Sequence, residues 1–313
     1  MTSPDLLDAL REWATLLARL RQFFDERGLL EVQTPLARAY AVTDPYQRCF
    51  SVIDPANEGV VAGYLQPSPE SAMKQLLAAG SGSIYQICKA FRAGESGSNH
   101  RTEFTLLEWY RVGYDHRQLM EEVAELVNQL LGPLPVERIT WRESFVRYAD
   151  IDPVVAEPEA LNARLPGSMR ITTLDVSDEG QRRKLLDRLL VSRIEPNLGR
   201  NCMTFLYDYP ADQAALARVR SEPWPVASRF ELYIDGLEIA NGFHELKDAA
   251  EQRQRFEYDN RQRQRDANVE VALDEPLLSC LDRLPDCAGV ALGVDRLMKI
   301  STGADSLVAG SPP

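Results

Sequence analysis

Residues 229–246, RFELYIDGLEIANGFHEL, constrain the fold of this chain more than any other segment. Asp235 and Gly236 stand between two runs of apolar, aromatic and polar residues, a strong signal for a two-residue hairpin turn. The segment therefore predicts two adjacent antiparallel strands. In the register set by this turn, Glu231 and Glu238 are diagonal neighbours on one face of the hairpin.

Two carboxylates in this relation lie about 7–8 Å apart. They repel by about 2 kcal/mol at an effective dielectric constant of 20. A divalent cation between Glu231 and Glu238 would turn this repulsion into attraction. Magnesium uses few protein carboxylates together with phosphate oxygens and water, so the pair suits a metal–nucleotide site. A solvated hairpin face with two unrelated glutamates is the alternative.

The second strand of this hairpin continues through Asn241, Phe243 and Glu245. An amide, an aromatic ring and a carboxylate would suit a ligand amine. Strict alternation places these residues on the face opposite Glu238. They serve the same site only if a bulge at residues 240–242 redirects the chain.

A second antiparallel pair is predicted from SIYQICKAFR and EFTLLEWYR, which flank the polar loop AGESGSNHRT. On the later strand, Phe104, Glu108 and Tyr110 share a face. A carboxylate and a phenol beside apolar residues suit the binding of an amine, and an exposed edge face is the alternative.

The loop of this second pair has features of a nucleotide site. Arg92 ends the first strand, where a guanidinium could bind a phosphate bidentately. Glu95 and His100 lie in the loop, which could close over a nucleotide. In GVALGVDRLMKI a strand reaches a helix at Gly293, where free N–H groups attract anions. Arg296 lies in the first turn of that helix, and a simple pair with Asp295 is the alternative.

The composition limits the remaining possibilities. The chain has 313 residues and a net charge of -12, which disfavours broad contact with a phosphate backbone. Its five cysteines form no CxxC pair and are interpreted as thiols in a reducing cytoplasm. Neither a signal peptide nor an apolar stretch of membrane-spanning length is recognised. We expect one domain over residues 1–313, with a proline-rich insertion at about 133–225.

Four segments occur in a characteristic order: GLLEVQTPL, FR…HRTEFTLLEWY, EIANGFHEL and GVALGVDRL. In that order they resemble the signature motifs of class II aminoacyl-tRNA synthetases, in particular the lysyl branch. The resemblance implies an α+β catalytic domain with a mainly antiparallel sheet of about six strands flanked by helices. It also implies a homodimer, because the first segment belongs to the motif that forms the dimer interface in this class.

Lysyl-tRNA synthetases carry an anticodon-binding barrel before the first motif, whereas only about thirty residues precede EVQTP here. This length, with LLEWYRVGYD and PDCAGVALGVDRL, is similar to the elongation factor P (R)-β-lysine ligase family, truncated paralogues of the lysyl enzymes. That family activates (R)-β-lysine with ATP and transfers it to a lysine side chain of elongation factor P. The resemblance implies ATP and Mg²⁺ as cofactors, and lysine or β-lysine and elongation factor P as partners. It implies no tRNA, no membrane and a cytoplasmic location.

The family roles carry over to matching positions. Those expected to be catalytic are Arg92 on the α-phosphate, Arg296 on the γ-phosphate, and Glu231 and Glu238 on magnesium. Further nucleotide contacts are expected from Glu95, His100, Phe104 and Gly293. The amino-acid site is expected to contain Glu70, Glu108, Tyr110, Asn241, Phe243, Glu245 and Ala291.

Ala291 bears on the lysine isomer. Lysyl-tRNA synthetases usually have glycine at this position, and the ligase family has alanine. The extra methyl group would disfavour an α-amino group and suit a β-amino group, a discrimination of about 1–3 kcal/mol. An ordinary strand alanine is the alternative.

The chain also departs from the family pattern. The second motif usually reads Phe-Arg-Asn-Glu, whereas residues 91–94 read Phe-Arg-Ala-Gly and the glutamate follows as Glu95. Ser98 and Asn99 replace the usual arginine before His100, so the adenine contacts are the least defined. Two alternatives to the ligase stay open: a stand-alone synthetase-like enzyme that uses α-lysine and another acceptor, and a non-catalytic regulatory paralogue.

Overall fold

The computed structural model describes residues 3–57, 59–173, 179–221, 224–265, 269–304 and 307. The chain divides into two compact units. The first unit comprises Met1–Leu130 and Gly242–Pro313, and the second comprises Leu131–Asn241. That both belong to one catalytic domain, with an insertion at about 133–225, stays a prediction.

The first unit is built around strands β1 (Leu30–Glu31), β5 (Ile84–Phe91), β6 (Glu103–Val112) and β12 (Cys287–Gly293), in that spatial order. β5 and β6 form the predicted long-looped antiparallel pair, with Ile84 opposite Tyr110 and Phe91 opposite Glu103. β12 is antiparallel to β6, whereas β1 is parallel to β5. Helix α9 (Val294–Thr302) follows β12, as predicted.

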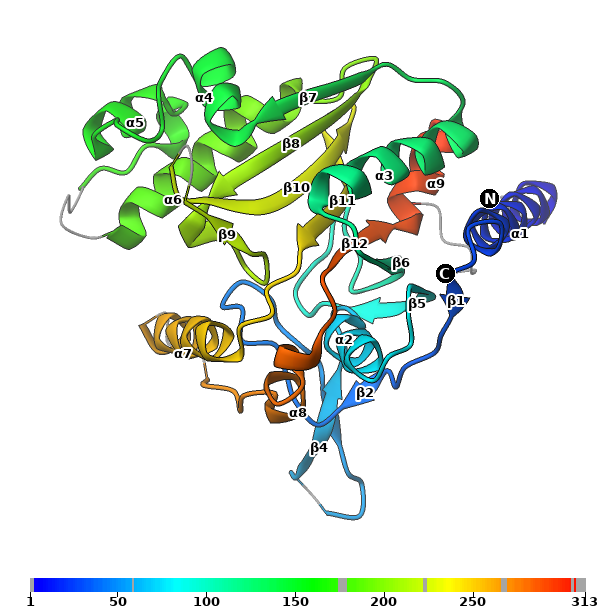
Figure 1. Cartoon of the computed structure of the whole chain (residues 1–313). Coiled ribbons are helices and arrows are strands. Elements are labelled where there is room, and N and C mark those ends of the chain that lie inside the picture. The colour runs from blue at the N-terminus through cyan, green and yellow to red at the C-terminus, as the bar shows by residue number, and fades with distance from the viewer. Residues whose placement is uncertain are drawn as a thin grey trace. The chain divides into compact units, whose positions relative to one another are not determined.

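Helices and a small sheet complete this unit. The small sheet has the order β2 (Ala37–Arg38), β4 (Val61–Leu65) and β3 (Ser51–Ile53). The helices are α1 (Ser3–Asp25), α2 (Glu70–Ala78), α3 (His116–Leu131, which ends at the unit boundary), α7 (Ala249–Arg265) and α8 (Glu275–Leu278). Figure 1 shows α2 and α8 side by side. On α1, Leu16, Leu20, Phe23 and Phe24 are buried.

The second unit contains strands β7 (Val136–Thr140), β8 (Met203–Pro210), β9 (Val219–Arg220) and β10 (Val226–Ile234), and β11 (Leu237–His244) begins in it. β7 and β8 are parallel, and β10 pairs antiparallel with β8 and β9. Helices α4 (Trp141–Ala149), α5 (Pro158–Arg164) and α6 (Glu179–Leu189) accompany these strands, with α5 against α6 and α4 against β8 (Figure 1).

The mainly antiparallel sheet flanked by helices is confirmed, but it has more strands than the six predicted. Within the described residues it has nine, and three of these, β7, β8 and β9, come from residues 133–225, where strands were not predicted. β8 is buried along almost its whole length, so it lacks the polar alternation that identifies a strand in a sequence.

The predicted Asp-Gly hairpin is confirmed. β10 ends at Ile234 and β11 begins at Leu237. Asp235 and Gly236 between them have φ angles of 49° and 73°, the positive values that a type I′ turn requires. The N–H of Asp235 donates to Gly199 O at 2.9 Å, so a distant loop of the same unit supports the turn.

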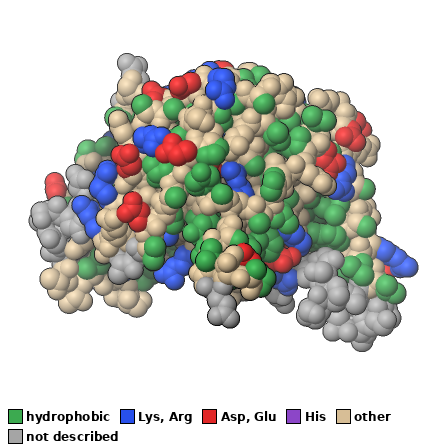
Figure 2. Space-filling view, turned by 90° about the horizontal axis from the view of Figure 1, so that it is seen from below, with side chains coloured by type: hydrophobic (Ala, Val, Ile, Leu, Met, Phe, Trp, Pro, Cys, Tyr) green, Lys and Arg blue, Asp and Glu red, His purple; other side chains and the backbone are tan. Residues whose placement is uncertain are grey.

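The described part of the chain has no helix with the length and apolar character needed to cross a bilayer. All five cysteines are free thiols, and Cys280 and Cys287 are buried. Figure 2 shows hydrophobic side chains mixed with acidic and basic ones on one face of the surface.

Candidate active site

An acidic cluster in the first unit is formed by Glu70, Lys74, Glu108, Tyr110 and Glu245. Glu70 begins α2, and Lys74 lies one turn later on the same side of the helix. The Lys74 ammonium is fully buried, and its Nζ lies 2.7 Å from Glu70 Oε1 and 2.6 Å from Glu245 Oε2. Two predicted site carboxylates from distant parts of the chain therefore share one internal cation.

The third carboxylate of the cluster, Glu108, is held by hydroxyl groups. Ser68 Oγ donates to Glu108 Oε2 and Tyr110 Oη donates to Glu108 Oε1, each at 2.7 Å. Glu108 and Tyr110 are both only 2% exposed. The exposed edge face considered from the sequence is therefore wrong, because β6 lies between β5 and β12.

The register of β6 and β12 places two small residues beside this cluster. Ala291 is opposite Glu108, and Gly289 is opposite Tyr110. Directly opposite residues of an antiparallel pair project from the same face. A Cβ on Gly289 would lie 2.3 Å from a Tyr110 ring carbon and 2.6 Å from Glu245 Oε1. Only glycine at this position leaves room for both side chains.

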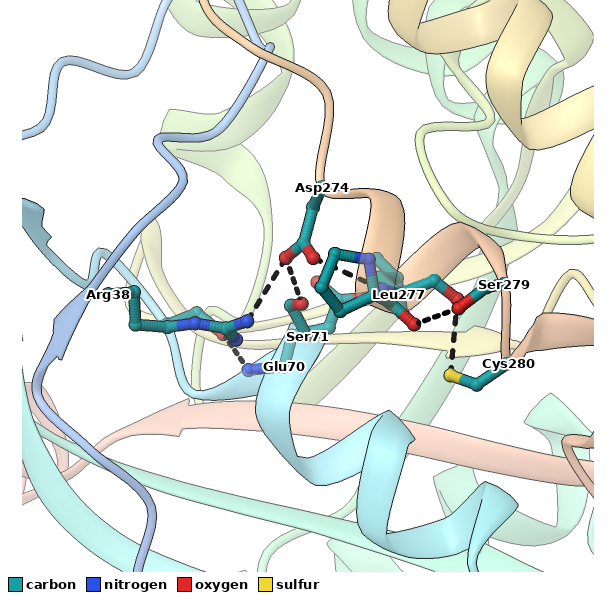
Figure 3. A network of polar contacts seen from close by, with 9 residues as sticks. Arg38, Glu70, Ser71, Asp274, Leu277, Ser279 and Cys280 are labelled. Atoms are coloured by element: carbon teal, nitrogen blue, oxygen red, sulfur yellow. Dashed lines mark hydrogen bonds and ion pairs between the residues drawn. The ribbon is translucent and has the colours of Figure 1, made fainter.

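The first turn of α2 is tied to α8 and β2 by a polar network (Figure 3). Asp274 Oδ2 accepts hydrogen bonds from Ser71 Oγ and from Arg38 Nη2, the latter at 3.1 Å. Asp274 Oδ1 also caps α8, because it accepts from the Leu277 N–H at 3.1 Å. Ser71 directly follows Glu70, so the network fixes the backbone from which Glu70 projects.

Burial and like charges alter the acid strengths in the cluster. Burial, with the charge of Glu70 next in importance, raises the pKa of Glu108 to about 8. Burial also raises the pKa of Glu245 to about 7, although the Lys74 charge opposes this shift. For Lys74, burial lowers the pKa, but Glu245 and Glu70 more than offset it, so the pKa lies above its usual range. Lys74 is therefore a permanent cation here.

The raised pKa of Glu108 predicts a specific pH dependence of stability. Between the unfolded value of 4.5 and the folded value of about 8, the folded chain binds more protons at this group than the unfolded chain does. The free energy of unfolding therefore falls as the pH rises through this window. One pKa unit corresponds to about 1.4 kcal/mol. Between pH 5 and pH 8, the free energy of unfolding of the wild type should therefore fall by about 1–3 kcal/mol more than that of Glu108→Gln.

Urea denaturation of the ligand-free protein at several pH values measures this difference. Glu125→Gln is the matched control, because the Glu125 side chain is 63% exposed and should leave the pH profile of the wild type unchanged. Parallel stability profiles for the wild type and Glu108→Gln would contradict an ionisation of Glu108 near pH 8.

A second cluster in the first unit gathers the predicted nucleotide residues. Arg92 directly follows β5, and its guanidinium carbon lies 5.1 Å from the centre of the Phe104 ring. Its Nη1 lies 3.9 Å from Glu95 Oε1, a long ion pair. Arg92 Nε is buried and has no hydrogen-bond partner among the described residues. An unsatisfied guanidinium N–H of this kind suits an incoming anion.

His100 and Arg296 complete this nucleotide cluster. Arg296 Nη2 lies 3.1 Å from His100 Nε2. Burial lowers the pKa of His100, and the charges of Arg296 and Arg92 lower it further. A neutral imidazole can accept a hydrogen bond from the guanidinium through Nε2. Asp295, the other partner considered for Arg296, is buried and accepts the Thr105 N–H at 2.6 Å.

The C-terminal part of the chain holds the loop of this cluster. Lys299 Nζ donates to Asn99 Oδ1 at 2.5 Å, and Arg101 Nη2 donates to Leu307 O at 2.6 Å. Gly293 is the residue before the first turn of α9, as predicted for an anion-attracting helix start. The Leu307 N–H also donates to Ser98 O at 3.3 Å, so Ser98 and Asn99, which depart from the family pattern, have structural partners of their own.

In the second unit, Glu231 is buried among polar partners that the sequence did not reveal. The hydroxyls of Tyr209 and Tyr233 donate to Glu231 Oε2 at 2.6 Å each, and Arg229 Nη2 donates to Oε1. Burial raises the pKa of both tyrosines, and the charges of Glu231 and Glu238 raise it further. Glu238 is thus close to the same groups as Glu231, in agreement with a shared hairpin face.

Glu231 and Glu238 offer carboxylate oxygens, the kind of ligand that magnesium prefers. A carboxylate offers about four lone pairs, and Glu231 uses three of them on Tyr209, Tyr233 and Arg229. One lone pair of Glu231 remains, and the partly exposed Glu238 lies close to the same two tyrosines. This set fits a magnesium ion that takes most of its ligands from phosphate and water. The described residues contain no group of three or more His, Cys, Asp or Glu side chains placed to hold a metal.

The remaining predicted residues lie on β11. Phe243 is partly exposed in the first unit. Asn241 belongs to the second unit, and its Oδ1 is buried without a hydrogen-bond partner among the described residues. The bulge at residues 240–242 stays a prediction. Sequence reasoning missed Lys74, Ser68 and Gly289, of which only Lys74 had a local signal, its four-residue spacing from Glu70.

Comparison with known proteins identifies the family of this chain. The family of class II tRNA synthetases (D, K and N) matches residues 1–309. The chain belongs to this family, and its α+β fold is the class II synthetase fold.

More specific relatives are found among curated proteins. The elongation factor P–(R)-β-lysine ligase of Salmonella typhi is 44% identical to this chain over 300 residues, which cover 94% of this chain and 91% of that protein. The proteins of the same name from Salmonella heidelberg and Salmonella dublin are 44% and 43% identical over the same shares.

Proposed function

We propose that this chain is an ATP-dependent ligase that activates (R)-β-lysine and transfers it to a lysine side chain of elongation factor P. The observation that carries the proposal is the charge of the acidic cluster. The cluster has three carboxylates and one internal ammonium, which contacts Glu70 and Glu245, so two negative charges remain when Glu108 is ionised. A diamino acid brings two ammonium groups, which need such buried partners.

The proposed reaction has two steps. A carboxylate oxygen of the amino acid attacks the α-phosphorus of ATP, and the bond to the departing pyrophosphate breaks, which gives an acyl-adenylate. The acceptor lysine amine then attacks the carbonyl carbon, loses a proton and displaces AMP. Arg92 and Arg296 are proposed to stabilise the negative charge that develops on the phosphates in the transition state. This stabilisation is proposed to be the main electrostatic contribution to catalysis.

The other residues of the nucleotide cluster are proposed to orient ATP. Phe104 would stack on the adenine, and Glu95, His100 and the helix start at Gly293 would contact the nucleotide. Glu231 and Glu238 would hold magnesium, which neutralises phosphate charge when bound. Asn241 and Phe243 are proposed to join Glu70, Glu108, Tyr110, Glu245 and Ala291 in binding the amino acid.

Two assays run in parallel test the proposal. ATP–pyrophosphate exchange should be stronger with (R)-β-lysine than with α-lysine, and purified elongation factor P should gain the mass of one β-lysyl group. Stronger exchange with α-lysine would overturn the substrate. Charging of tRNA without modification of elongation factor P would overturn the acceptor, and no exchange with either isomer would favour a non-catalytic protein.

We further propose a cytoplasmic homodimer. Leu30 on the edge strand β1 is 56% exposed and Leu36 is 40% exposed, and both lie in the segment GLLEVQTPL that the resemblance assigns to the dimer interface. Burial of such side chains stabilises association. Sedimentation equilibrium should give twice the monomer mass, and Leu30→Glu should shift the protein toward the monomer.

The methyl group of Ala291 is predicted to decide between lysine isomers. Ala291→Gly should shift the ratio of kcat/KM values toward α-lysine by about 10- to 100-fold, since one methyl is worth about 1–3 kcal/mol. Ala288→Gly is the matched control, because Ala288 is opposite Arg111, on the other face of β12. Pyrophosphate exchange with both isomers measures the ratio, and an unchanged ratio in Ala291→Gly would contradict the assignment.

A further inference from the structure

We infer that Lys74 is a positioning residue that occupies the space between Glu70 and Glu245 and directs their remaining oxygens toward the ammonium groups of the substrate. The inference rests on the proposed function and assigns a specificity role to a side chain that does not itself need to touch the substrate. The three carboxylates of the acidic cluster are of two kinds: Glu70 and Glu245 contact Lys74, whereas Glu108 is bound by hydroxyl groups.

The contacts of Lys74 define one oxygen of each partner. Nζ lies 2.7 Å from Glu70 Oε1 and 2.6 Å from Glu245 Oε2, and the side chain is fully buried. Glu70 is on α2, whereas Glu245 directly follows β11. The lysine therefore joins two elements that the chain places far apart. Glu70 Oε2 and Glu245 Oε1 are the oxygens that it leaves for other cations.

The free oxygen of Glu245 has a defined direction. Glu245 Oε1 lies 2.6 Å from the position that a Cβ on Gly289 would occupy. It is therefore turned toward β12, the strand on which Ala291 follows two residues later on the same face. Because Lys74 fixes the opposite oxygen, rotation of the carboxylate away from β12 would break the ion pair.

The third carboxylate has no need of such an internal cation. Both oxygens of Glu108 accept hydroxyl hydrogen bonds, from Ser68 and Tyr110. A ligand ammonium can approach Glu108 without displacing a lysine. In contrast, without Lys74 a ligand ammonium would enter the gap between Glu70 and Glu245, where two carboxylates attract it more strongly than one. Lys74 thus excludes this misplaced binding mode by filling it.

Lys74→Met tests the inference by pyrophosphate exchange. The methionine keeps much of the side-chain volume and removes the cation. We expect the KM for (R)-β-lysine to rise at least tenfold, while the KM for ATP changes less than threefold. The preference for (R)-β-lysine over α-lysine should fall at least fivefold, because the amine can occupy the vacated gap. Lys184→Met, at an exposed position on α6, is the matched control and should match the wild type.

The pH profile separates positioning from a purely structural role. The groups that share charge interactions with Lys74 or its partners are Glu70, Glu108, Tyr110, Glu245, Cys280 and Cys287. Loss of the cation removes the interaction that lowers the pKa of Glu245, so more of this carboxyl is protonated at pH 7. Between pH 7 and pH 9 this carboxyl ionises and can again bind an ammonium group. Over this range the KM for (R)-β-lysine should therefore fall at least threefold more in Lys74→Met than in the wild type.

The possible outcomes distinguish this inference from the proposed function. No exchange by the wild type with either isomer would overturn the proposed function. Wild-type exchange with an unchanged KM and unchanged isomer preference in Lys74→Met would overturn the role of Lys74 alone. If Lys74→Met does not fold, the double variant Lys74→Met/Glu70→Gln removes the buried charge pair together. The KM for (R)-β-lysine should be at least tenfold higher than that of Glu70→Gln alone, and a KM and isomer preference equal to those of Glu70→Gln would overturn the inference.

Discussion

Arg92→Ala is expected to lower lysine-dependent ATP–pyrophosphate exchange by about 100- to 1000-fold or more. Removal of one preorganised donor to a developing negative charge costs this much in comparable sites. Arg92 Nε has no hydrogen-bond partner among the described residues, and Nη1 is only loosely paired with Glu95 at 3.9 Å. The arginine is therefore available to a phosphate, and little native structure depends on it.

Steady-state exchange with saturating (R)-β-lysine and varied ATP measures the effect. Arg92→Lys should recover only a small part of the rate, because an ammonium cannot bind phosphate bidentately. Arg283→Ala is the control, because Arg283 is exposed and its Nη1 donates to the Ser279 carbonyl at 3.2 Å. Exchange by Arg92→Ala within tenfold of the wild type would remove Arg92 from the catalytic residues.

Gly289→Ala is expected to raise the KM for (R)-β-lysine by about 100-fold and to destabilise the chain by about 1–3 kcal/mol. The new methyl group would lie 2.3 Å and 2.5 Å from two Tyr110 ring carbons and 2.6 Å from Glu245 Oε1. Both side chains must then move, and both are proposed to bind the amino acid. Tyr110 also donates to Glu108, so its displacement disturbs a third carboxylate.

Exchange kinetics and urea denaturation together measure this second effect. The KM for ATP should change less than threefold, because the nucleotide residues lie in the other cluster. Gly167→Ala is the matched control, since a Cβ there meets no atom within 4 Å and its φ is not positive. A KM for (R)-β-lysine within a few-fold of the wild type would show that Gly289 does not shape the amino-acid site.

Several elements could be predicted because their signals are local. The turn at Asp235 and Gly236 requires positive φ angles, and two adjacent residues suffice to encode it. The strands 84–91 and 103–112 follow from apolar runs on either side of a polar loop. These two antiparallel strand pairs predicted that Glu108 and Tyr110 share a face and that Glu231 and Glu238 lie close together.

Other parts of the site could not be predicted, because their partners are distant in the chain. Arg229 is two residues from Glu231 on the same strand, but Tyr209 reaches that glutamate from the neighbouring strand β8. The strand β8 itself was missed because it is buried on both faces. Nothing in the local sequence of Gly289 shows that two side chains from other segments occupy the place of its Cβ.

The amino-acid sequence alone determined the hairpins, the order of the motifs and the residue types available for nucleotide and amine binding, since these depend on neighbouring residues and on residue chemistry. Only the tertiary structure decided how the charges are shared. It placed a buried lysine between carboxylates 175 positions apart, at 2.7 Å from Glu70 and 2.6 Å from Glu245. The physical reason is that the energy of a buried charge depends on the charges and dipoles within a few ångströms, whatever their separation along the chain.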